Sequence, residues 1–391
     1  MQSASALLRV GFVLALAALL AGCATSSVRT TTTTPIIAGD PAMPEDQLLD
    51  VGVRLFDPGV DEIDEDEMTT LPEIRQAEAR YVPTVLVDTL QRSGHWGAVR
   101  VVPDGTGLTD VVVDGKIIES NGEKLEVEIT VSDSSGTQWY KRNYSGLASK
   151  YSYQSRQGPE PFQDVYNRIA NDLAVYRGRL GAAEARNLRT ITELRFAEGF
   201  SPQAFGGYLK QNGKGVYAVE RLPAVNDPML GRIRQIRERD YLFIDTLQDY
   251  YNGFARDMAN PYQEWRKQSY EESIAYRELR QQATMRTVAG VAAILAGIAA
   301  SGGDSGSTRA AGTVGILGGA ALVKSGFDKR TESEMHAEAL QELGGSLSAE
   351  ITPQVIDLED RTVTLTGTVQ DQYGQWRQIL HGIYASETGN I

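Results

Sequence analysis

The single cysteine of this 391-residue chain, Cys23, stands directly after an uninterrupted apolar run, and this placement constrains everything that follows. One cysteine forms no intramolecular disulfide, so the fold must be stabilised by packing alone. The apolar residues 10–21 are too few to span a bilayer but have the length of a secretory signal core, and Arg9 supplies its preceding positive charge. We therefore expect residues 1–22 to be a signal peptide and the folded body to follow Cys23.

The residues Leu20-Ala21-Gly22-Cys23 resemble the processing site of bacterial lipoproteins. The resemblance implies cleavage after Gly22 and acylation of the Cys23 thiol, so membrane lipid is the first expected partner. Several acyl chains give stable anchoring where one is marginal. Ala24, rather than Asp, follows the cysteine, which by resemblance to enterobacterial sorting implies the outer membrane, with the body facing the periplasm. The alternative is a buried N-terminal helix with an incidental cysteine.

The charge of the chain limits its partners and its chemistry. The formal net charge is −13, and such an acidic surface repels phosphate backbones, so we expect no nucleic-acid partner. His95, His336 and His381 are scattered, so the sequence predicts no histidine-based catalytic site, no metal, no cofactor and no enzyme. The acidic run at residues 61–67 lacks the spacing of a calcium-binding loop. A hydrolase is kept as a third option, to be tested on ester or glycan substrates.

Composition divides the chain into regions and predicts an α+β fold. Residues 23–45 are rich in threonine and proline and poor in large apolar side chains, which predicts a flexible tether. The body is then predicted to comprise a small α/β docking domain at 46–178, a mainly helical region at 179–286, a Gly/Ala-rich apolar hairpin at 287–327 and a C-terminal αββα segment at 328–391.

Apolar patterns in residues 46–178 predict the order strand, helix, strand, hairpin, strand, helix. Asn121-Gly122 marks the hairpin turn, because both residues tolerate the left-handed backbone that such a turn requires. The strands are predicted at 51–55, 98–102, 110–120, 124–132 and 138–145, and the helices at 72–91 and 161–176.

This order resembles a small α/β domain of envelope proteins, and residues 51–56, 86–96 and 110–118 carry the resemblance. The family includes the curli-secretion lipoprotein, the lipoprotein activators of penicillin-binding proteins and the N-terminal domain of the Tol propeller protein. The resemblance implies a docking or ring-forming module, so envelope proteins or further copies of the chain are expected partners. The chain departs from the curli lipoprotein in having no pair of long amphipathic strands from which a secretion barrel is built.

The next region contains a long helical pattern. Asp227 and Pro228 are typical of a helix start, and an apolar stripe continues from there to residue 286. Asn260-Pro261 is expected to kink or interrupt the helix. The stripe predicts ordinary packing, with a subunit contact as the alternative, because so long a helix is hard to bury within one small domain. A helix at 182–200 and a short strand at 216–219 are predicted before it.

Two uncharged apolar runs, residues 287–300 and 310–323, flank a polar turn at 301–309. As helices they are about 21 Å long, shorter than a bilayer core of about 30 Å. Small residues recur at every fourth position, as in glycine-zipper segments of envelope proteins, and favour close packing in a membrane or oligomer: Ala289, Ala293, Gly297, Ala311, Gly315 and Gly319. The open alternatives are a hairpin buried against the protein's own helices, insertion into the outer membrane or an oligomeric channel, disorder, and partner capture.

The C-terminal segment opens with a capping box at residues 331–334, which predicts a helix to Leu343. Strands are predicted at 350–358 and 361–369 and a closing helix at 375–384. The strand pair is similar to half of the periplasmic BON module, a phospholipid-associated fold.

These patterns predict a lipid-anchored outer-membrane lipoprotein that acts as a non-enzymatic assembly, transport or secretion component of the envelope. The alternative is a periplasmic lipoprotein regulator that binds and activates a cell-wall enzyme, in which the apolar hairpin is only a core element.

Overall fold

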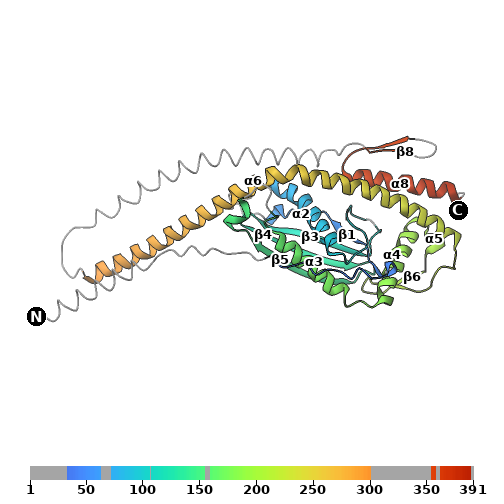
Figure 1. Cartoon of the computed structure of the whole chain (residues 1–391), viewed down its shortest axis with the longest axis horizontal. Helices are drawn as coiled ribbons and strands as arrows, with labels where there is room; N and C mark the ends of the chain where they lie inside the picture. The colour runs from blue at the N-terminus through green and yellow to red at the C-terminus, as the bar shows by residue number, and fades with distance from the viewer. Residues whose placement is uncertain are drawn as a thin grey trace, which may run out of the picture. The chain divides into compact units, whose positions relative to one another are not determined.

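The computed structural model describes residues 33–62, 72–105, 107–154, 159–300, 354–357 and 362–388. Its fold is mixed α and β, as the sequence predicts (Figure 1). Several predicted features lie outside the described residues: the signal and Cys23, the polar turn and second apolar run with Ala311, Gly315 and Gly319, and the helix opened by the capping box.

Five strands form one mixed sheet in the order β2-β1-β3-β4-β5. Strand β1 pairs in parallel with both β2 and β3, whereas β3, β4 and β5 are successive antiparallel strands. Gly122 has a φ of +73° at the turn between β3 and β4, which confirms the predicted hairpin. The strand bounds are β1 Val51–Arg54, β2 Val99–Val102, β3 Val111–Ser120, β4 Lys124–Asp133 and β5 Gln138–Leu147.

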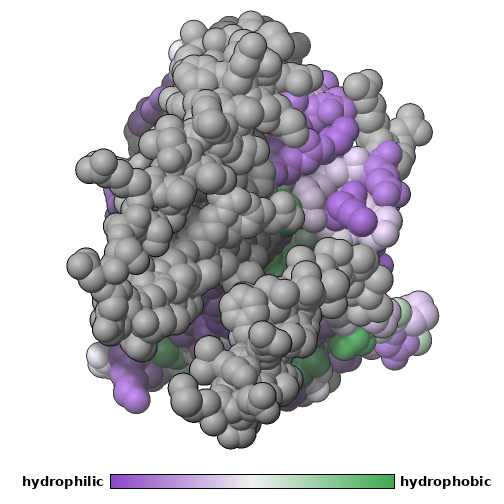
Figure 2. Space-filling model, turned by 90° about the vertical axis from the view of Figure 1, so that its left-hand side faces the viewer, coloured by the Kyte–Doolittle hydropathy of each residue, from purple (hydrophilic) through white to green (hydrophobic). Residues whose placement is uncertain are grey.

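Helices α2 (Pro72–Ser93) and α3 (Gln163–Arg177) pack on this sheet and on each other. The alternating side chains of β4 explain why, since Leu125, Val127, Ile129 and Val131 are all buried. On its other face, β4 carries partly exposed charged residues that pair across strands. The sheet therefore has one apolar face and one polar face. Seen from the left-hand side of Figure 1, most of the described residues in view are hydrophilic (Figure 2).

The remaining elements extend the same core. They are the turns η1 (Glu45–Gln47), η2 (Val60–Glu62) and η3 (Lys150–Tyr153), helices α4 (Ala182–Phe200), α5 (Pro202–Phe205), α6 (Pro228–Ala300) and α8 (Val369–Thr388), and the antiparallel pairs β6 (Leu209–Gln211) with β7 (Tyr217–Val219) and β8 (Gln354–Asp357) with β9 (Thr362–Leu365). Buried residues of α4, α6 and α8 belong to one hydrophobic core with those of the sheet. The boundary predicted at residue 179 therefore does not separate two cores.

Helix α6 is the longest element, with 73 residues, and the structure corrects one prediction about it. The side chain of Asp227 caps it, because Oδ1 accepts hydrogen bonds from the Met229 and Leu230 amides. Of the two outcomes predicted at Asn260-Pro261, an interruption is wrong, since the helix continues through Pro261, whereas the axis of α6 does change direction about midway along the helix (Figure 1). Proline removes one backbone hydrogen bond, but the buried neighbours Tyr262 and Trp265 hold the helix against the domain.

The apolar stripe of α6 is buried against the domain, so the interpretation as ordinary packing is confirmed for Ile233, Ile236, Phe243, Leu247, Phe254 and Met258. The first apolar run, residues 287–300, with Ala289, Ala293 and Gly297, is the C-terminal part of α6 and not a separate helix. Among the described residues, no helix has an apolar stretch long enough to cross a membrane.

The predicted flexible tether is too long, because its second half is bound to the domain. Asn167 donates a hydrogen bond to the Thr34 carbonyl at 2.7 Å, and Asn171 accepts one from the Ile37 amide at 2.8 Å. The Gly39 amide donates to the Ser93 carbonyl at 2.8 Å. Two asparagine amides on α3 thus satisfy backbone groups that would otherwise be solvated, so residues 34–37 lie along that helix and Gly39 lies at the end of α2.

Candidate functional site

Helix α6 presents two matching sets of polar residues to the domain. Tyr241, Asp245 and Gln248 are spaced by four and three residues, and Tyr262, Arg266 and Ser269 repeat this spacing 21 residues later. Because 21 residues are close to six helical turns, both sets lie on one face of the helix. Together with Asp240, which contacts α8, we call these residues the α6 clamp.

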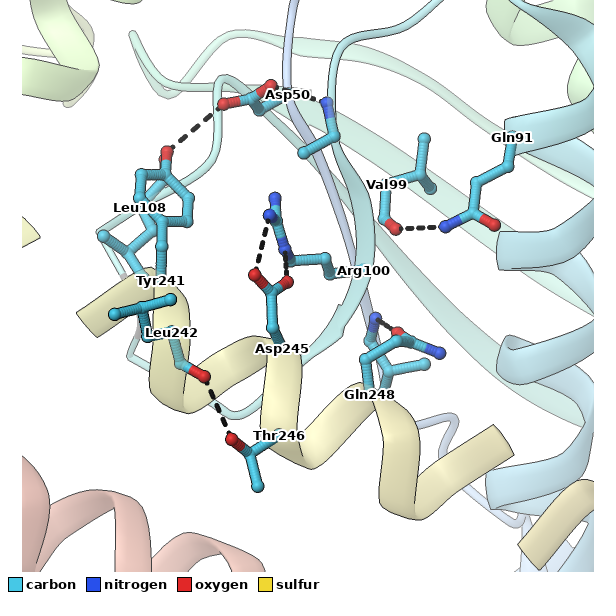
Figure 3. Close-up of polar contacts among 12 residues, drawn as sticks. Asp50, Gln91, Val99, Arg100, Leu108, Tyr241, Leu242, Asp245, Thr246 and Gln248 are labelled. Atoms are coloured by element: carbon cyan, nitrogen blue, oxygen red, sulfur yellow. Dashed lines mark hydrogen bonds and ion pairs between the residues drawn. The ribbon is translucent and has the colours of Figure 1, made fainter. Parts of the chain in front are cut away.

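The first set joins α6 to the edge of the sheet (Figure 3). Arg100 on β2 forms a two-pronged ion pair with Asp245, with Nε–Oδ1 at 2.5 Å and Nη2–Oδ2 at 3.3 Å. Its guanidinium also lies 5.1 Å from the ring centre of Tyr241. The Tyr241 hydroxyl donates to the Leu108 carbonyl at 2.8 Å and lies 3.2 Å from Asp50 Oδ2. These contacts place α6 along β2 and beside the start of β1.

The same region closes the exposed edge of strand β2. A free strand edge offers unpaired N–H and C=O groups to other chains. Here the Val101 amide donates to Gln248 Oε1 at 2.6 Å, and Gln91 Nε2 of α2 donates to the Val99 carbonyl at 2.9 Å (Figure 3). Two glutamine side chains therefore take the place of a sixth strand.

The second set contains a buried ion pair. Arg266 is 2 % exposed and binds Glu160 through both carboxylate oxygens, with Nη1–Oε1 at 2.5 Å and Nη2–Oε2 at 3.0 Å. The guanidinium lies 4.1 Å from the ring centre of Tyr262, and the Tyr81 hydroxyl donates to Glu160 at 3.1 Å. Burial acts to lower the pKa of Arg266, but the charge and hydrogen bonds of Glu160 together with Tyr262 and Tyr81 raise it well above its usual value. The Arg266 guanidinium therefore stays protonated.

A second buried carboxylate, Glu78, lies beside this pair. Its Oε1 accepts hydrogen bonds from Tyr262 and from Ser120, both at 2.6 Å, and Arg75 lies 3.8 Å away. Burial raises the pKa of Glu78, against the opposing effects of Arg75 and the two hydroxyl donors. Glu78 thus connects α2, β3 and α6 in one polar network.

The turn between β3 and β4 is held against the backbone of α6. The Ser269 hydroxyl donates to the Asn121 carbonyl at 2.7 Å. A side chain on Gly122 would place its Cβ 2.3 Å from the carbonyl oxygen of Arg266, and the positive φ of Gly122 disfavours one as well. Glycine is therefore required here by both the turn and the helix contact.

The third part of the clamp holds α8. Asp240 is fully buried and accepts hydrogen bonds from Arg377 at 3.1 Å and from the Tyr373 hydroxyl at 3.3 Å. Arg377 also lies 4.4 Å from the ring centre of Phe200 on α4. Burial raises the pKa of Asp240 to about 6, although Arg377 acts to lower it. This ion pair therefore weakens when the carboxylate is protonated below that pH.

The polar contacts of the clamp connect different secondary-structure elements to one another. Glu78 and Asp240 are engaged by hydroxyl or guanidinium donors from other elements. His95 forms its 3.1 Å contact with the Ile37 carbonyl, and His381 stacks on Phe200 at 4.2 Å. Within the described ranges, no three histidine, cysteine, aspartate or glutamate side chains come together to hold a metal ion.

The residues singled out from the sequence are not brought together within the described ranges. Ala289, Ala293 and Gly297 lie on α6 beyond the clamp, whereas Leu20, Ala21, Gly22 and Cys23 lie outside the described residues. Sequence reasoning missed the clamp residues themselves. One signal was present, because charged residues such as Asp240 and Arg266 lie beside buried aromatic residues in the stripe of α6.

Comparisons with known proteins find only loose similarity. No family model matches the sequence, and a search of curated proteins finds no match. A Xanthomonas campestris protein of the DUF330 family aligns over 36% of this chain and 90% of its own, with 12% identity and a TM-score of 0.24. A PelC dodecamer from Paraburkholderia phytofirmans aligns over 41% and 96%, with 15% identity and a TM-score of 0.20. The chain is thus loosely similar to two solved structures.

Proposed function

We propose that this protein is a lipid-anchored component of the outer membrane that faces the periplasm and acts in envelope assembly or transport without catalysing a reaction. In this proposal, the α/β domain binds envelope partners or further copies of the chain. The α6 clamp then holds the helix that carries residues 287–300 in a fixed direction.

The continuity of α6 supports this proposal most directly. One helix leads from the clamp at residues 240–269 to the apolar residues 287–300 without a break. At 1.5 Å per residue its 73 residues extend over about 110 Å. Buried ion pairs and aromatic contacts at one end of such a helix convert it into a stiff arm, whose other end contacts the membrane or neighbouring subunits.

The bound tether supports a position close to the anchoring membrane. Among the described residues, Thr34 is the first whose hydrogen bonds tie the chain to α3. From Cys23 to Thr34 the chain spans at most about 40 Å, whatever its conformation, because a residue contributes no more than about 3.6 Å. So short a linker favours a role beside the membrane over a regulator whose body crosses the periplasm.

Two experiments test the proposal. Radiolabelled palmitate should enter the wild-type protein in cells and should not enter a Cys23→Ser variant; equal labelling of both contradicts the anchor. In intact membrane vesicles with the body accessible, trypsin should leave Arg309 uncut until detergent is added, because the flanking apolar runs are covered by lipid or subunits. Rapid cleavage without detergent contradicts the proposed contact and favours a soluble regulator.

A further inference from the structure

The loop that leads into α6 exposes two large apolar side chains. Leu222 is 68 % exposed and Val225 is 91 % exposed, and both lie between β7 and the start of α6. Isolated exposed apolar residues are common, but two so close together on one loop mark a surface for interaction.

This loop is held in shape by contacts at both of its ends. At one end the Glu220 amide donates to the Tyr208 carbonyl at 2.9 Å, and the Arg221 guanidinium lies 4.1 Å from the Tyr208 ring centre. At the other end the Asp227 amide donates to the Ala224 carbonyl at 3.1 Å, closing a turn in which Asn226 has a φ of +63°. Val225 is thus presented at the outer corner of an ordered turn, so burying it on a partner requires little further ordering.

Positive charge accompanies these apolar residues. Residues 206–226 contain Lys210, Lys214 and Arg221 but only one acidic residue, Glu220, in a chain whose formal net charge is −13. All three basic residues are exposed. An anionic bilayer repels the acidic body and attracts this segment, and apolar side chains beside basic ones are the combination that binds a charged lipid surface.

We infer that residues 206–226 form a second, non-covalent membrane contact, in which Leu222 and Val225 enter the headgroup region of an anionic phospholipid bilayer and the basic residues bind lipid phosphates. The inference draws on the proposed lipid anchor only for bringing the loop to a membrane. It is independent of the contact proposed for residues 287–323.

The test places an environment-sensitive fluorophore on the loop through Val225→Cys, in a full-length mature chain in which Cys23→Ser leaves no other thiol. On vesicles of phosphatidylethanolamine and phosphatidylglycerol at a ratio of about 3:1, the emission of the label should shift to shorter wavelength and should be quenched by brominated lipid. On pure phosphatidylcholine vesicles neither change should occur. A matched control is Leu242→Cys, because Leu242 is 67 % exposed on α6 but lies beside the acidic Asp245. Its label should not respond.

Two further variants measure the two contributions. The double variant Lys210→Glu with Lys214→Glu should weaken binding to the anionic vesicles at least tenfold, because each basic residue near the surface contributes about fivefold or more to the affinity. Leu222→Ser, with the label kept at position 225, should weaken it about tenfold. Unchanged thermal unfolding of both variants would show that the fold is intact.

Three results would overturn the inference: no response at position 225 on anionic vesicles, an equal response at position 242, or a response at 225 that requires added envelope protein. The last result would assign the loop to a protein partner. None of them would alter trypsin protection at Arg309 or palmitate labelling of Cys23, so this inference can fail while the proposed function stands.

Discussion

Replacing Arg266 with methionine tests the buried part of the α6 clamp. The variant Arg266→Met keeps most of the apolar volume but leaves Glu160, which is 11 % exposed, charged and without its partner. Breaking a buried ion pair in this way costs about 3–5 kcal/mol. Against a typical free energy of unfolding of about 5–15 kcal/mol, this is a large fraction of the total stability.

The matched control is Arg92→Met, which removes an i,i+4 pair with Asp88 whose side chains are 50 % and 65 % exposed. Such a surface pair contributes only about 0.3–0.5 kcal/mol. The assay is urea unfolding followed by circular dichroism. With a slope of about 3 kcal/mol per molar urea, the midpoint should fall by about 1–1.7 M for Arg266→Met and by less than about 0.2 M for Arg92→Met.

The double variant Arg266→Met with Glu160→Gln separates the pair from general packing. The double variant has no uncompensated charge. Its loss of stability should therefore be smaller, by at least about 1 kcal/mol, than the sum of the losses of the two single variants. Hydrogen exchange should show faster exchange of the α6 amides near residues 262–270 in Arg266→Met. The reasoning is refuted if Arg266→Met loses less than about 1 kcal/mol, or if the two single losses add.

Three other perturbations follow from the clamp. Because the pKa of Asp240 is raised from 3.8 to about 6 in the folded state, the folded protein binds a proton more tightly than the unfolded chain, and the stability that this proton contributes falls as the pH rises from about 4 to 6. Urea unfolding at several pH values should therefore show the wild type losing stability relative to Asp240→Asn over that range. A stability difference that stays constant with pH would contradict this. Gly122→Ala should lower the stability by about 2 kcal/mol or more, measured by thermal unfolding, because Cβ would meet the Arg266 carbonyl; an unchanged melting temperature would contradict the contact. Gln248→Leu leaves the Val101 amide without its acceptor and should cost about 1–3 kcal/mol of stability, measured by urea unfolding. It should also increase aggregation, measured by light scattering, because the edge of β2 is less well covered. A variant as stable and soluble as the wild type would show that this edge needs no cover.

The regular elements could be predicted from the sequence because their faces repeat at short range. Alternation in β4 and the helical spacing in α4 are local signals, and the observed strand and helix lie within one residue of their predicted ranges. Asn121-Gly122 likewise specifies its own turn. Local periodicity was therefore sufficient for the sheet and its covering helices.

The clamp could not be predicted because its partners are far apart in the chain. Arg266 and Glu160 are separated by 106 residues, and the Val101 amide and Gln248 by 147. Nothing in the pattern around Arg266 indicates which carboxylate it will meet, and surface and buried arginines look alike in sequence. Long-range pairing of this kind is decided by the packing of whole elements.

Two incorrect predictions have the same origin. Composition alone suggested a free tether, but Asn167 and Asn171 on α3 provide hydrogen bonds for part of it. Pro261 suggested a kink or a break in α6, and the break does not occur because the packing of neighbouring residues outweighs the loss of one hydrogen bond. In both cases a tertiary contact overrides a local preference.

The central claim is that α6 is one stiff helix from the clamp to the apolar run. Spin labels introduced through Asp257→Cys and Thr287→Cys, in the Cys23→Ser full-length chain, lie on either side of Pro261 and span the end of the clamp. A continuous helix predicts a narrow distance distribution centred near 45 Å, since 30 residues rise by about 1.5 Å each. A broad distribution, or one centred below about 35 Å, would contradict it.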